Sequence, residues 1–300
     1  MDRANEDPRM SSREISSPGR RLRLAWAAET LVIPGVFNPL VARMAERMGF
    51  RAMYMSGAAL SASYAVPDIG ILTQTEFADA ARALTRAANL PLLCDADTGF
   101  GEALNVERTV HLMEEAGAAG IHLEDQHFPK RCGHLSGKSL VPPEEMVAKL
   151  RAAVAARRDP DFVIVARTDA RGVTGFDDAV KRALLYLEAG ADAIFPEALE
   201  TAEEFAKFSH EVPAPLLANM TEFGKGPTLD VHTLASLGYR MVIYPVTVLR
   251  SALKAAEHTL ADILKKGHQR DRLSHMLTRA ELYDLLDYAG YEERDRAYFG

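Results

Sequence analysis

The sequence predicts an α/β fold: a single (β/α)8 barrel of the TIM type with extra C-terminal helices. The main observation is that eight short apolar runs alternate with amphipathic segments along the chain. Each run is nearly continuous in apolar residues at its start, as expected for parallel strands buried on both faces. Eight strand–helix units within 300 residues fit one closed barrel. The runs are 31–37, 50–56, 91–97, 120–126, 162–170, 193–198, 215–220 and 241–245.

A weak internal repeat supports the barrel. Segments with helical spacing, such as 38–49, 144–158 and 177–190, separate the runs, and four glycines each follow such a segment. Glycine tolerates the left-handed conformation that commonly ends a helix. The next strand ends seven residues after each of these glycines, so the same unit recurs around the ring. The pairs of glycine and strand end are Gly49 and Ser56, Gly117 and Glu124, Gly190 and Glu197, and Gly238 and Pro245.

The chain divides into three parts. Residues 1–22 are polar and carry both charge signs, which is typical of a flexible N-terminal arm. Residues 23–260 contain the eight units and form the predicted catalytic domain. Residues 261–300 are surplus to the barrel and include a second helical stretch at 279–293. Such a tail can cross a subunit interface, cover the barrel mouth or lie on its own barrel, and the pattern alone leaves these alternatives open.

Composition excludes several classes of protein. Hydrophobic residues make up 48% of the chain, which allows a large core. The net charge is −7 and no long Lys/Arg run is present, so a nucleic-acid partner is not expected. No apolar stretch is long enough to span a membrane, and the N-terminus lacks the apolar segment of a secretory signal. We therefore expect a cytoplasmic enzyme without a disulfide framework, since the chain has only two cysteines.

Polar side chains gather where the strands end. Barrel enzymes build their sites at the C-terminal ends of the strands. Six of the eight runs end in charged or hydrogen-bonding residues that would converge on one mouth. Helix caps and loop polarity could account for Asp125 and Asp169, but not for a convergence from six strands. The residues are Tyr54 and Ser56, Asp95 and Asp97, Glu124 and Asp125, Arg167 and Asp169, Glu197, and Asn219 and Thr221.

The segment DADTGFG (95–101) predicts a metal site. Asp95 and Asp97 are two apart, so on a strand both would point to the same side. Two adjacent carboxylates repel each other unless a cation lies between them or one is protonated. Hard oxygen ligands suit Mg²⁺, with Mn²⁺ as a substitute, and Glu124 on the next strand could orient a metal-bound water. The alternative is an ordinary Asp-rich turn.

The loop KRCGHLSGK (130–138) predicts a reactive thiol. Cys132 is flanked by Lys130, Arg131 and His134, and neighbouring cations favour the thiolate. Cys94 lies within an apolar run and fits a buried structural role instead. Glycines 133 and 137 are typical of a loop that closes over a substrate. We therefore expect Cys132, with His134, to transfer protons.

Three arginines could bind carboxylates. Arg167 ends the fifth run, where its planar fork matches a carboxylate, although a salt bridge to Asp169 or Glu197 is a rival interpretation. Arg250 and Arg279 lie on predicted helices, and by position alone they would be solvated charges.

Together these segments resemble the isocitrate lyase and phosphoenolpyruvate mutase superfamily, and most closely its bacterial 2-methylisocitrate lyases. The resemblance spans roughly residues 25–292 in consistent order, and KRCGH is its most specific motif. The further matching segments are YMSG (54–57), PDIG (67–70), IHLEDQ (121–126), VARTDA (165–170), FPEA (195–198), ANMTEFG (218–224), YPVTVLR (244–250) and TRAELYDLLDY (278–288).

The resemblance implies roles for individual residues. Asp95 and Asp97 would bind Mg²⁺, Cys132 would protonate the carbanion-like product, and Tyr54 would take the hydroxyl proton. Arg167 would bind near the breaking bond. Ser56, Gly57 and Ala58 would hold one carboxylate, and the second carboxylate pocket would contain Glu197, Asn219, Met220, Thr221, Arg250 and Arg279. The remaining implied site residues are Lys130, Gly133 and His134.

The implied reaction is a retro-aldol cleavage of a small 2-hydroxy di- or tricarboxylate. With 2-methylisocitrate the products would be pyruvate and succinate. One alternative is 2,3-dimethylmalate cleavage, since Leu-Ser-Gly at 135–137 resembles isocitrate lyases and 2,3-dimethylmalate-type lyases. Another is oxaloacetate decarboxylation or mutase-type chemistry, which Cys132 disfavours because those reactions need no acid on that loop. A catalytically silent binding barrel is a fourth alternative. Members of the superfamily are commonly tetramers that exchange the last helix, which favours a homotetramer and an interface role for the tail.

Overall fold

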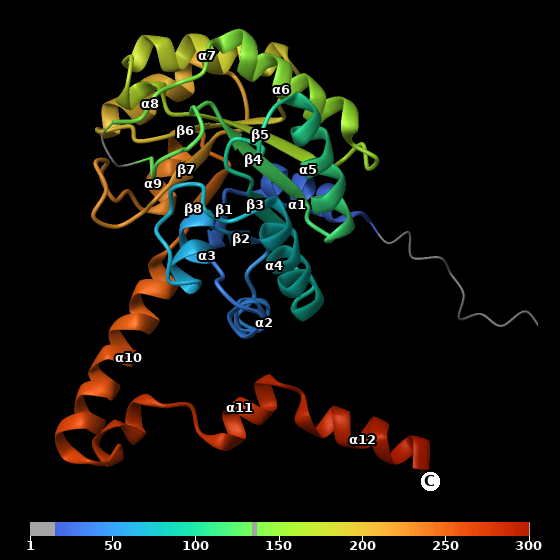
Figure 1. Ribbon diagram of the computed structural model, residues 1–300, viewed down its shortest axis with the longest axis vertical. Helices are drawn as coiled ribbons and strands as arrows, with labels where there is room; N and C mark the ends of the chain where they lie inside the picture. Colours follow the sequence, from blue (N-terminus) through green and yellow to red (C-terminus); the bar gives the residue numbers. More distant parts are fainter. Residues whose placement is uncertain (1–15, 134–136, 300) are drawn as a thin grey trace, which may run out of the picture.

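The computed structural model describes residues 16–133 and 137–299. Eight parallel strands alternate with helices that cover their outer side (Figure 1). Each strand lies within one of the predicted runs. The strands are β1 (Leu31–Pro34), β2 (Met53–Met55), β3 (Leu92–Asp95), β4 (Gly120–Glu124), β5 (Val163–Thr168), β6 (Ala193–Pro196), β7 (Leu217–Asn219) and β8 (Met241–Tyr244).

The helices fill the intervals between the strands. The α-helices are α1 (Pro18–Ala28), α2 (Pro39–Arg47), α3 (Gly57–Ser63), α4 (Gln74–Ala87), α5 (Ala103–Glu115), α6 (Pro143–Ala156), α7 (Phe176–Glu188), α8 (Ala202–Glu211), α9 (Val231–Ser236), α10 (Thr247–Lys266), α11 (Arg279–Leu285) and α12 (Tyr288–Phe299). The 3₁₀ segments are η1 (Ala170–Gly172) and η2 (Arg270–His275).

The strands form a closed ring. Strands β2 to β6 pair in chain order, and β1 pairs with β8, which pairs with β7. Two parallel bridges join these sheets, one from Gly35 to Tyr54 and one from Ile194 to Leu216. All pairings are parallel, so the carboxyl ends of the strands meet at one mouth. The predicted TIM-type barrel is confirmed.

Local sequence explains why the covering helices form where they do. Helix α4 begins at a capping box, in which Thr73 and Glu76 satisfy each other's free backbone N–H groups. Phe77, Ala81 and Leu84 then recur at helical spacing and are buried against the barrel. Burial of side chains of this kind removes about 25 cal/mol of unfavourable hydration per Å² of apolar surface.

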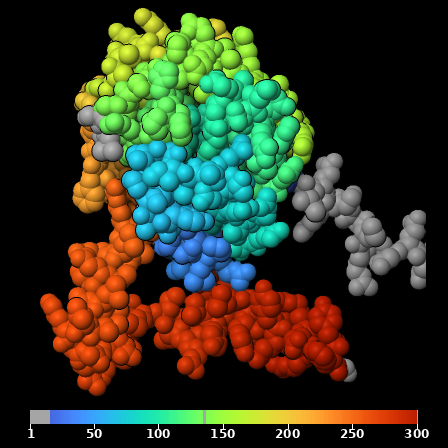
Figure 2. All heavy atoms as spheres, in the orientation of Figure 1, coloured from blue at the N-terminus to red at the C-terminus, as the bar shows by residue number. Residues whose placement is uncertain are grey.

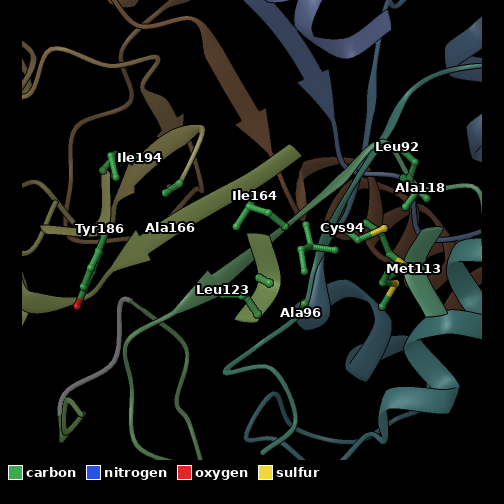
Figure 3. Close-up of a cluster of buried hydrophobic side chains, with 14 of the residues drawn as sticks. Leu92, Cys94, Ala96, Met113, Ala118, Leu123, Ile164, Ala166, Tyr186 and Ile194 are labelled. Atoms are coloured by element: carbon green, nitrogen blue, oxygen red, sulfur yellow. The ribbon is translucent and has the colours of Figure 1, made fainter. Parts of the chain in front are cut away.

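The hydrophobic core has two layers. The outer layer lies between strands and helices and contains Cys94, Met113, Ile164 and Tyr186 (Figure 3). The inner layer fills the barrel with the alternate strand side chains, such as Leu93 and Phe195.

Helix α1 closes the inner layer at one end. Its Leu22 and Trp26 join the inner layer, and a side chain at Gly19 would lie 2.3 Å from the backbone oxygen of Asp161. The predicted arm 1–22 is therefore too long, because residues from Pro18 onward are helical and Leu22 is fully buried.

The four predicted glycine helix stops are confirmed. Gly49, Gly117, Gly190 and Gly238 have φ angles of 89°, 82°, 101° and 90°. A side chain at these positions would be strained, so glycine is needed for the turn from each helix into the next strand.

The C-terminal tail departs from the barrel. Helix α10 is continuous through Lys266, so the predicted boundary at 260 falls inside a helix. It leads away from the barrel to α11 and α12, which run beneath α2 (Figures 1 and 2). The predicted helix 279–293 is interrupted, because Asp287 has a left-handed φ of 57° between α11 and α12. In the part of the chain that the structure describes, no helix is long and apolar enough to cross a membrane.

Candidate active site

A cavity of about 80 Å³ opens at the carboxyl ends of the strands. Most residues that the sequence predicted for the site line it. They are Tyr54, Ser56, Ala58, Asp95, Lys130, Cys132, Gly133, Arg167, Glu197, Asn219, Thr221 and Arg250. The predicted convergence on one mouth is therefore present in the fold.

The two aspartates of the predicted metal site are buried together. Strand β3 ends at Asp95, and Asp97 lies beyond it with a left-handed φ of 45°. The expectation that both lie on one strand was wrong, since the chain turns at Asp97 toward Gly99. The turn still brings them together, because the Asp97 backbone N–H donates to Asp95 Oδ1 at 3.0 Å. The Gly57 N–H, at the start of α3, donates to Asp95 Oδ2, also at 3.0 Å.

Lys130 neutralises part of this acidic cluster. Its Nζ lies 2.9 Å from Asp97 Oδ1 and also pairs with Asp68. Burial opposes the charge of Lys130, but the carboxylates, Asp97 first, raise its pKa well above the usual value. Burial raises the pKa of Asp97 to about 7, partly offset by Lys130. Asp95 has a lowered pKa: burial works in the opposite direction, and His122, Lys130 and Arg167 outweigh it.

Glu124 is the site's least satisfied carboxylate. Both of its oxygens are buried and accept no hydrogen bond, although the Arg167 guanidinium lies 3.2 Å from Oε2. Burial raises the pKa of Glu124 well above its usual value, although Arg167 opposes this. Buried oxygens without donors are costly unless a cation approaches them.

These oxygens fit a hard divalent cation. Among residues 16–133 and 137–299, no group of three or more His, Cys, Asp and Glu side chains is placed to hold a metal ion by itself. Asp95, Asp97 and Glu124 therefore do not form a complete protein cage. Mg²⁺ commonly uses only one or two carboxylates and fills its shell with water and substrate oxygens, so the residues present suit it.

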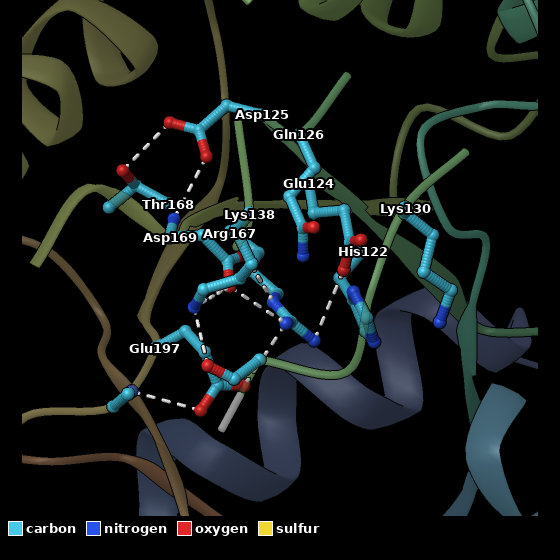
Figure 4. A network of polar contacts seen from close by, with 12 residues as sticks. His122, Glu124, Asp125, Gln126, Lys130, Lys138, Arg167, Thr168, Asp169 and Glu197 are labelled. Atoms are coloured by element: carbon cyan, nitrogen blue, oxygen red, sulfur yellow. Dashed lines mark hydrogen bonds and ion pairs between the residues drawn. The ribbon is translucent and has the colours of Figure 1, made fainter. Parts of the chain in front are cut away.

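Arg167 lies at the centre of the polar network (Figure 4). Its guanidinium donates to Asp169 at 2.9 and 3.1 Å and lies 3.2 Å from Glu124 and 3.4 Å from Glu197. It also lies over the Phe195 ring, 5.1 Å from the centroid. Burial opposes its charge, but these carboxylates, Asp169 first, raise the pKa of Arg167 well above its usual value. Both predicted salt-bridge partners are thus present, and Arg167 still lines the cavity.

Tyr54 is hydrogen-bonded to a buried histidine. The Tyr54 hydroxyl and His122 Nε2 are 2.8 Å apart. Burial lowers the pKa of His122 to about 4, so the imidazole is neutral near pH 7. Burial, and then Asp95, raise the pKa of Tyr54 well above its usual value. The phenol is therefore held in its neutral form, and its role as the group that takes the hydroxyl proton stays a prediction.

The cysteines differ as the sequence predicts. Cys94 is fully buried, and burial raises the pKa of its thiol. Cys132 is partly exposed and lines the cavity. Its neighbour Gly133 packs directly on the site, because a side chain there would lie 2.4 Å from Glu197 Cγ and 2.5 Å from Arg167 Nη2.

The far side of the cavity is built from β6, β7 and α10. Glu197 accepts from Asn219 Nδ2 at 3.3 Å and from the Ala198 N–H at 2.9 Å. Arg250 donates to the carbonyl and carboxylate oxygens of Glu222 at 2.7 and 3.0 Å. This arginine therefore reaches the mouth already paired with a carboxylate.

Some predicted site residues lie elsewhere. Gly57 and Met220 are buried beside the site but do not line the cavity, and Met220 accepts a hydrogen bond from the Leu229 N–H through its sulfur. Arg279 is exposed at the start of α11 and is absent from the cavity lining. His134 lies outside the described residues.

Sequence reasoning missed three polar residues of the site. His122 is the middle of an apolar strand, and its only signal was its spacing of two from Glu124. Asp68 lies on a loop in the PDIG segment, and Lys138 is the last residue of the KRCGHLSGK segment. Lys138 pairs with Asp169 at 2.7 Å.

Comparisons with known proteins place the chain in a family. A family model described as phosphoenolpyruvate phosphomutase matches residues 22–264. The chain belongs to the phosphoenolpyruvate phosphomutase family. The predicted membership in the isocitrate lyase and phosphoenolpyruvate mutase superfamily is thereby confirmed.

Members of this family differ in their reactions. The 2-methylisocitrate lyase of Aeropyrum pernix is 56% identical over 282 residues, which cover 94% of this chain and 91% of that protein. A crystal structure of 2,3-dimethylmalate lyase matches with a TM-score of 0.88 and 33% identity, covering 95% and 96% of the two chains. Phosphonopyruvate hydrolase in complex with oxalate and Mg²⁺ matches with a TM-score of 0.83 and 36% identity, covering 94% and 97%.

Proposed function

We propose that this chain is a carbon–carbon lyase that cleaves 2-methylisocitrate to pyruvate and succinate. The observation that carries the proposal is that Cys132, Arg167 and Asp95 line one cavity. A thiol, a guanidinium and a metal-binding carboxylate are the groups that a retro-aldol cleavage needs, as acid, charge stabiliser and ligand. The identity of 56% to the A. pernix 2-methylisocitrate lyase supports the substrate.

Asp95, Asp97 and Glu124 would hold Mg²⁺, for which Mn²⁺ can substitute. The bound ion would polarise the hydroxyl and adjacent carboxylate of the substrate and so lower the pKa of that hydroxyl. The buried oxygens of Glu124, which accept no hydrogen bond, support this assignment. Lys130 would balance the charge of Asp97 and Asp68 around the ion.

The remaining residues would bind the substrate and move its protons. Ser56, at the start of α3, and Ala58 line the side of the cavity next to Asp95, where one carboxylate would lie. Asn219, Thr221 and Arg250 line the opposite side and would bind the second. Tyr54 would hydrogen-bond the bound acid as a neutral phenol.

Cleavage then follows from the positions of Arg167 and Cys132. The substrate hydroxyl would pass its proton to the Tyr54 oxygen, whose own proton would move to the neutral His122 Nε2, 2.8 Å away. A carbonyl then forms, and the electrons of the adjacent carbon–carbon bond pass to the departing carbon. Its carboxylate takes the charge as an enediolate, which the Arg167 guanidinium would stabilise. The Cys132 thiol would then donate its proton to that carbon and release succinate. Protonation by a positioned acid contributes about 10²–10⁴-fold to such reactions.

A second candidate is the cleavage of 2,3-dimethylmalate. The likeness to the 2,3-dimethylmalate lyase structure, with a TM-score of 0.88, favours it. Its chemistry would use the same residues, so only the second carboxylate pocket would change. Oxaloacetate decarboxylation or mutase-type chemistry would leave Cys132 without a role.

The C-terminal helices α10 to α12 would form contacts between subunits. Helices α10 to α12 expose many large apolar side chains, among them Leu264 at 87%, Phe299 at 86% and Leu260 at 67%. Exposed apolar surface of this extent marks an interaction site. We therefore propose a cytoplasmic homotetramer in which the tail is exchanged between subunits. Light scattering should give the mass of a tetramer for the full chain and a smaller mass for a chain ending at Gly267.

The test is pyruvate release from purified protein with Mg²⁺, using 2-methylisocitrate, 2,3-dimethylmalate and oxaloacetate in parallel. Rapid release from 2-methylisocitrate that is lost in Cys132→Ser supports the proposal, and Cys94→Ser is the matched control with unchanged turnover. Release only from 2,3-dimethylmalate selects the second candidate. Full turnover by Cys132→Ser would overturn both lyase functions.

A further inference from the structure

A buried lysine connects the cysteine loop to the central arginine. Lys138 has a side chain that is only 1% exposed. Its Nζ donates to the carbonyl oxygen of Gly133 and pairs with Asp169 Oδ1 at 2.7 Å. Burial of an ammonium is costly unless it is paired, so both contacts are needed to hold it there. Lys138 does not line the cavity.

Each contact of Lys138 leads to a group of the proposed reaction. Gly133 directly follows Cys132, so holding its carbonyl limits where the thiol can lie. Asp169 receives the Nε and Nη2 hydrogen bonds of Arg167. One ammonium therefore links the backbone beside the thiol to the carboxylate that orients the guanidinium (Figure 4).

The packing around Gly133 leaves no room for a side chain between the loop backbone and the residues of the site. A single added carbon there would lie 2.4 Å from Glu197 Cγ and 2.5 Å from Arg167 Nη2. The loop backbone is thus in direct contact with the two residues on which the substrate would lie. A shift of this backbone would change the distance between thiol and guanidinium, and a misplacement of about 1 Å can cost about 10²-fold in rate.

We propose that Lys138 is a positioning residue, which fixes Cys132 relative to Arg167 through Gly133 and Asp169. The proposal rests on the proposed function for its effect on turnover, but the placement of the Cys132 thiol can be measured without it. Lys138 supplies a cation that the loop carbonyl and the Asp169 carboxylate share.

The test compares Lys138→Met, which removes the ammonium, with Lys138→Arg, which keeps a cation. Arg157→Met is the control, because Arg157 also forms an ion pair, with Asp192 at 2.8 Å, that is partly buried, and Arg157 lines no part of the cavity. Each variant is made in full-length protein that also carries Cys94→Ser. The kcat and KM for 2-methylisocitrate, the rate of Cys132 alkylation by iodoacetamide and the melting temperature are measured.

We expect Lys138→Met to lower kcat by about 10²-fold while KM changes by only a few-fold. The substitution changes the distance from the Cys132 thiol to the reacting carbon, and it leaves the affinity for the substrate nearly unchanged. The alkylation rate of Cys132 should rise several-fold, and Lys138→Arg should restore much of both values. Arg157→Met should lower only the melting temperature. If Lys138→Met behaves like Arg157→Met, the proposal is overturned.

Two further outcomes are also decisive. If wild-type protein cleaves none of the acids, the proposed function fails, and the alkylation rates alone then decide the positioning role of Lys138. If Lys138→Met does not fold, Lys138→Gln replaces it, because the amide can still donate to the Gly133 carbonyl but carries no charge for Asp169. An alkylation rate equal to wild type in that variant would overturn the proposal, and an increased rate would support it.

Discussion

Replacing Arg167 by lysine should reduce both stability and turnover. The guanidinium contacts three buried carboxylates, Asp169, Glu124 and Glu197, at 2.9–3.4 Å. A lysine ammonium is a compact charge without the planar fork that holds carboxylates on different sides of the guanidinium. At least one carboxylate then loses its counter-charge, and breaking a buried pair in this way costs about 3–5 kcal/mol.

That cost should appear as a fall in melting temperature of about 6–10 °C, at about 2 °C per kcal/mol for a chain of this size. Turnover should fall by about 10²–10³-fold, because a fixed donor no longer faces the charge that develops during cleavage. Calorimetry at constant protein and Mg²⁺ concentration measures the first effect. Pyruvate release well below both melting temperatures measures the second.

Arg182→Lys separates the two effects. Arg182 is buried to a similar degree and pairs with Asp125 and Asp178, but it does not line the cavity. We expect a lower melting temperature with unchanged kcat. The reasoning is refuted if Arg167→Lys keeps kcat within a few-fold of wild type, or if Arg182→Lys loses as much turnover as Arg167→Lys.

Three further predictions concern the metal, the thiols and pH. Removal of Mg²⁺ with EDTA should abolish pyruvate release, and turnover that survives EDTA contradicts this. Adding Mg²⁺ back to the metal-free protein, at about 100 times its Kd, should raise the free energy of unfolding by about 2.7 kcal/mol. Iodoacetamide should modify Cys132 but not Cys94 in the native protein, because Cys94 is fully buried and burial raises its pKa; peptide mass spectrometry that finds native Cys94 modified would refute it. Burial would raise the pKa of Asp178, but hydrogen bonds from Thr174 and Arg182 outweigh it and lower that pKa. The ionised Asp178 should therefore stabilise the folded state fully above the ordinary aspartate pKa, and this stabilisation should be lost as pH falls through the lowered pKa of the folded state. The urea midpoints of wild type and Asp178→Asn should therefore converge as pH falls below about 4, and a constant difference would count against this assignment.

The fold could be predicted because the pattern that forms it is local. A buried parallel strand is mostly apolar along its length, and glycine is the favoured residue at a left-handed helix end. Both features are visible within a few residues of sequence, as at Gly190 and the strand that follows it. The site was largely predictable for the same reason, since Asp95, Arg167 and Glu197 stand directly at strand ends.

Interactions between segments far apart in the chain were harder to predict from the sequence. His122 is a polar residue inside an apolar run, and its contact with the Tyr54 hydroxyl depends on the pairing of three strands. Lys138 and Asp169 are 31 residues apart, and neither position alone indicates a buried pair. For Arg279 the resemblance predicted too much. It placed this residue in the substrate pocket, but in the described chain Arg279 does not line the cavity.

The charge balance of the site supports the proposal that it binds a divalent metal ion. In the described part of the chain, five carboxylates around the mouth form ion pairs with three cationic side chains: Asp68, Asp97, Glu124, Asp169 and Glu197 with Lys130, Lys138 and Arg167. A sixth carboxylate, that of Asp95, lies 3.5 Å from His122, which is neutral near pH 7. The raised pKa values of Asp97 and Glu124 are the consequence, since burial and excess negative charge both favour protonation. A di- or tricarboxylate would add further negative charge to this site. A divalent cation at Asp95, Asp97 and Glu124 would therefore serve two purposes: it would supply the charge that the buried carboxylates lack, and it would allow an anionic substrate to approach Arg167.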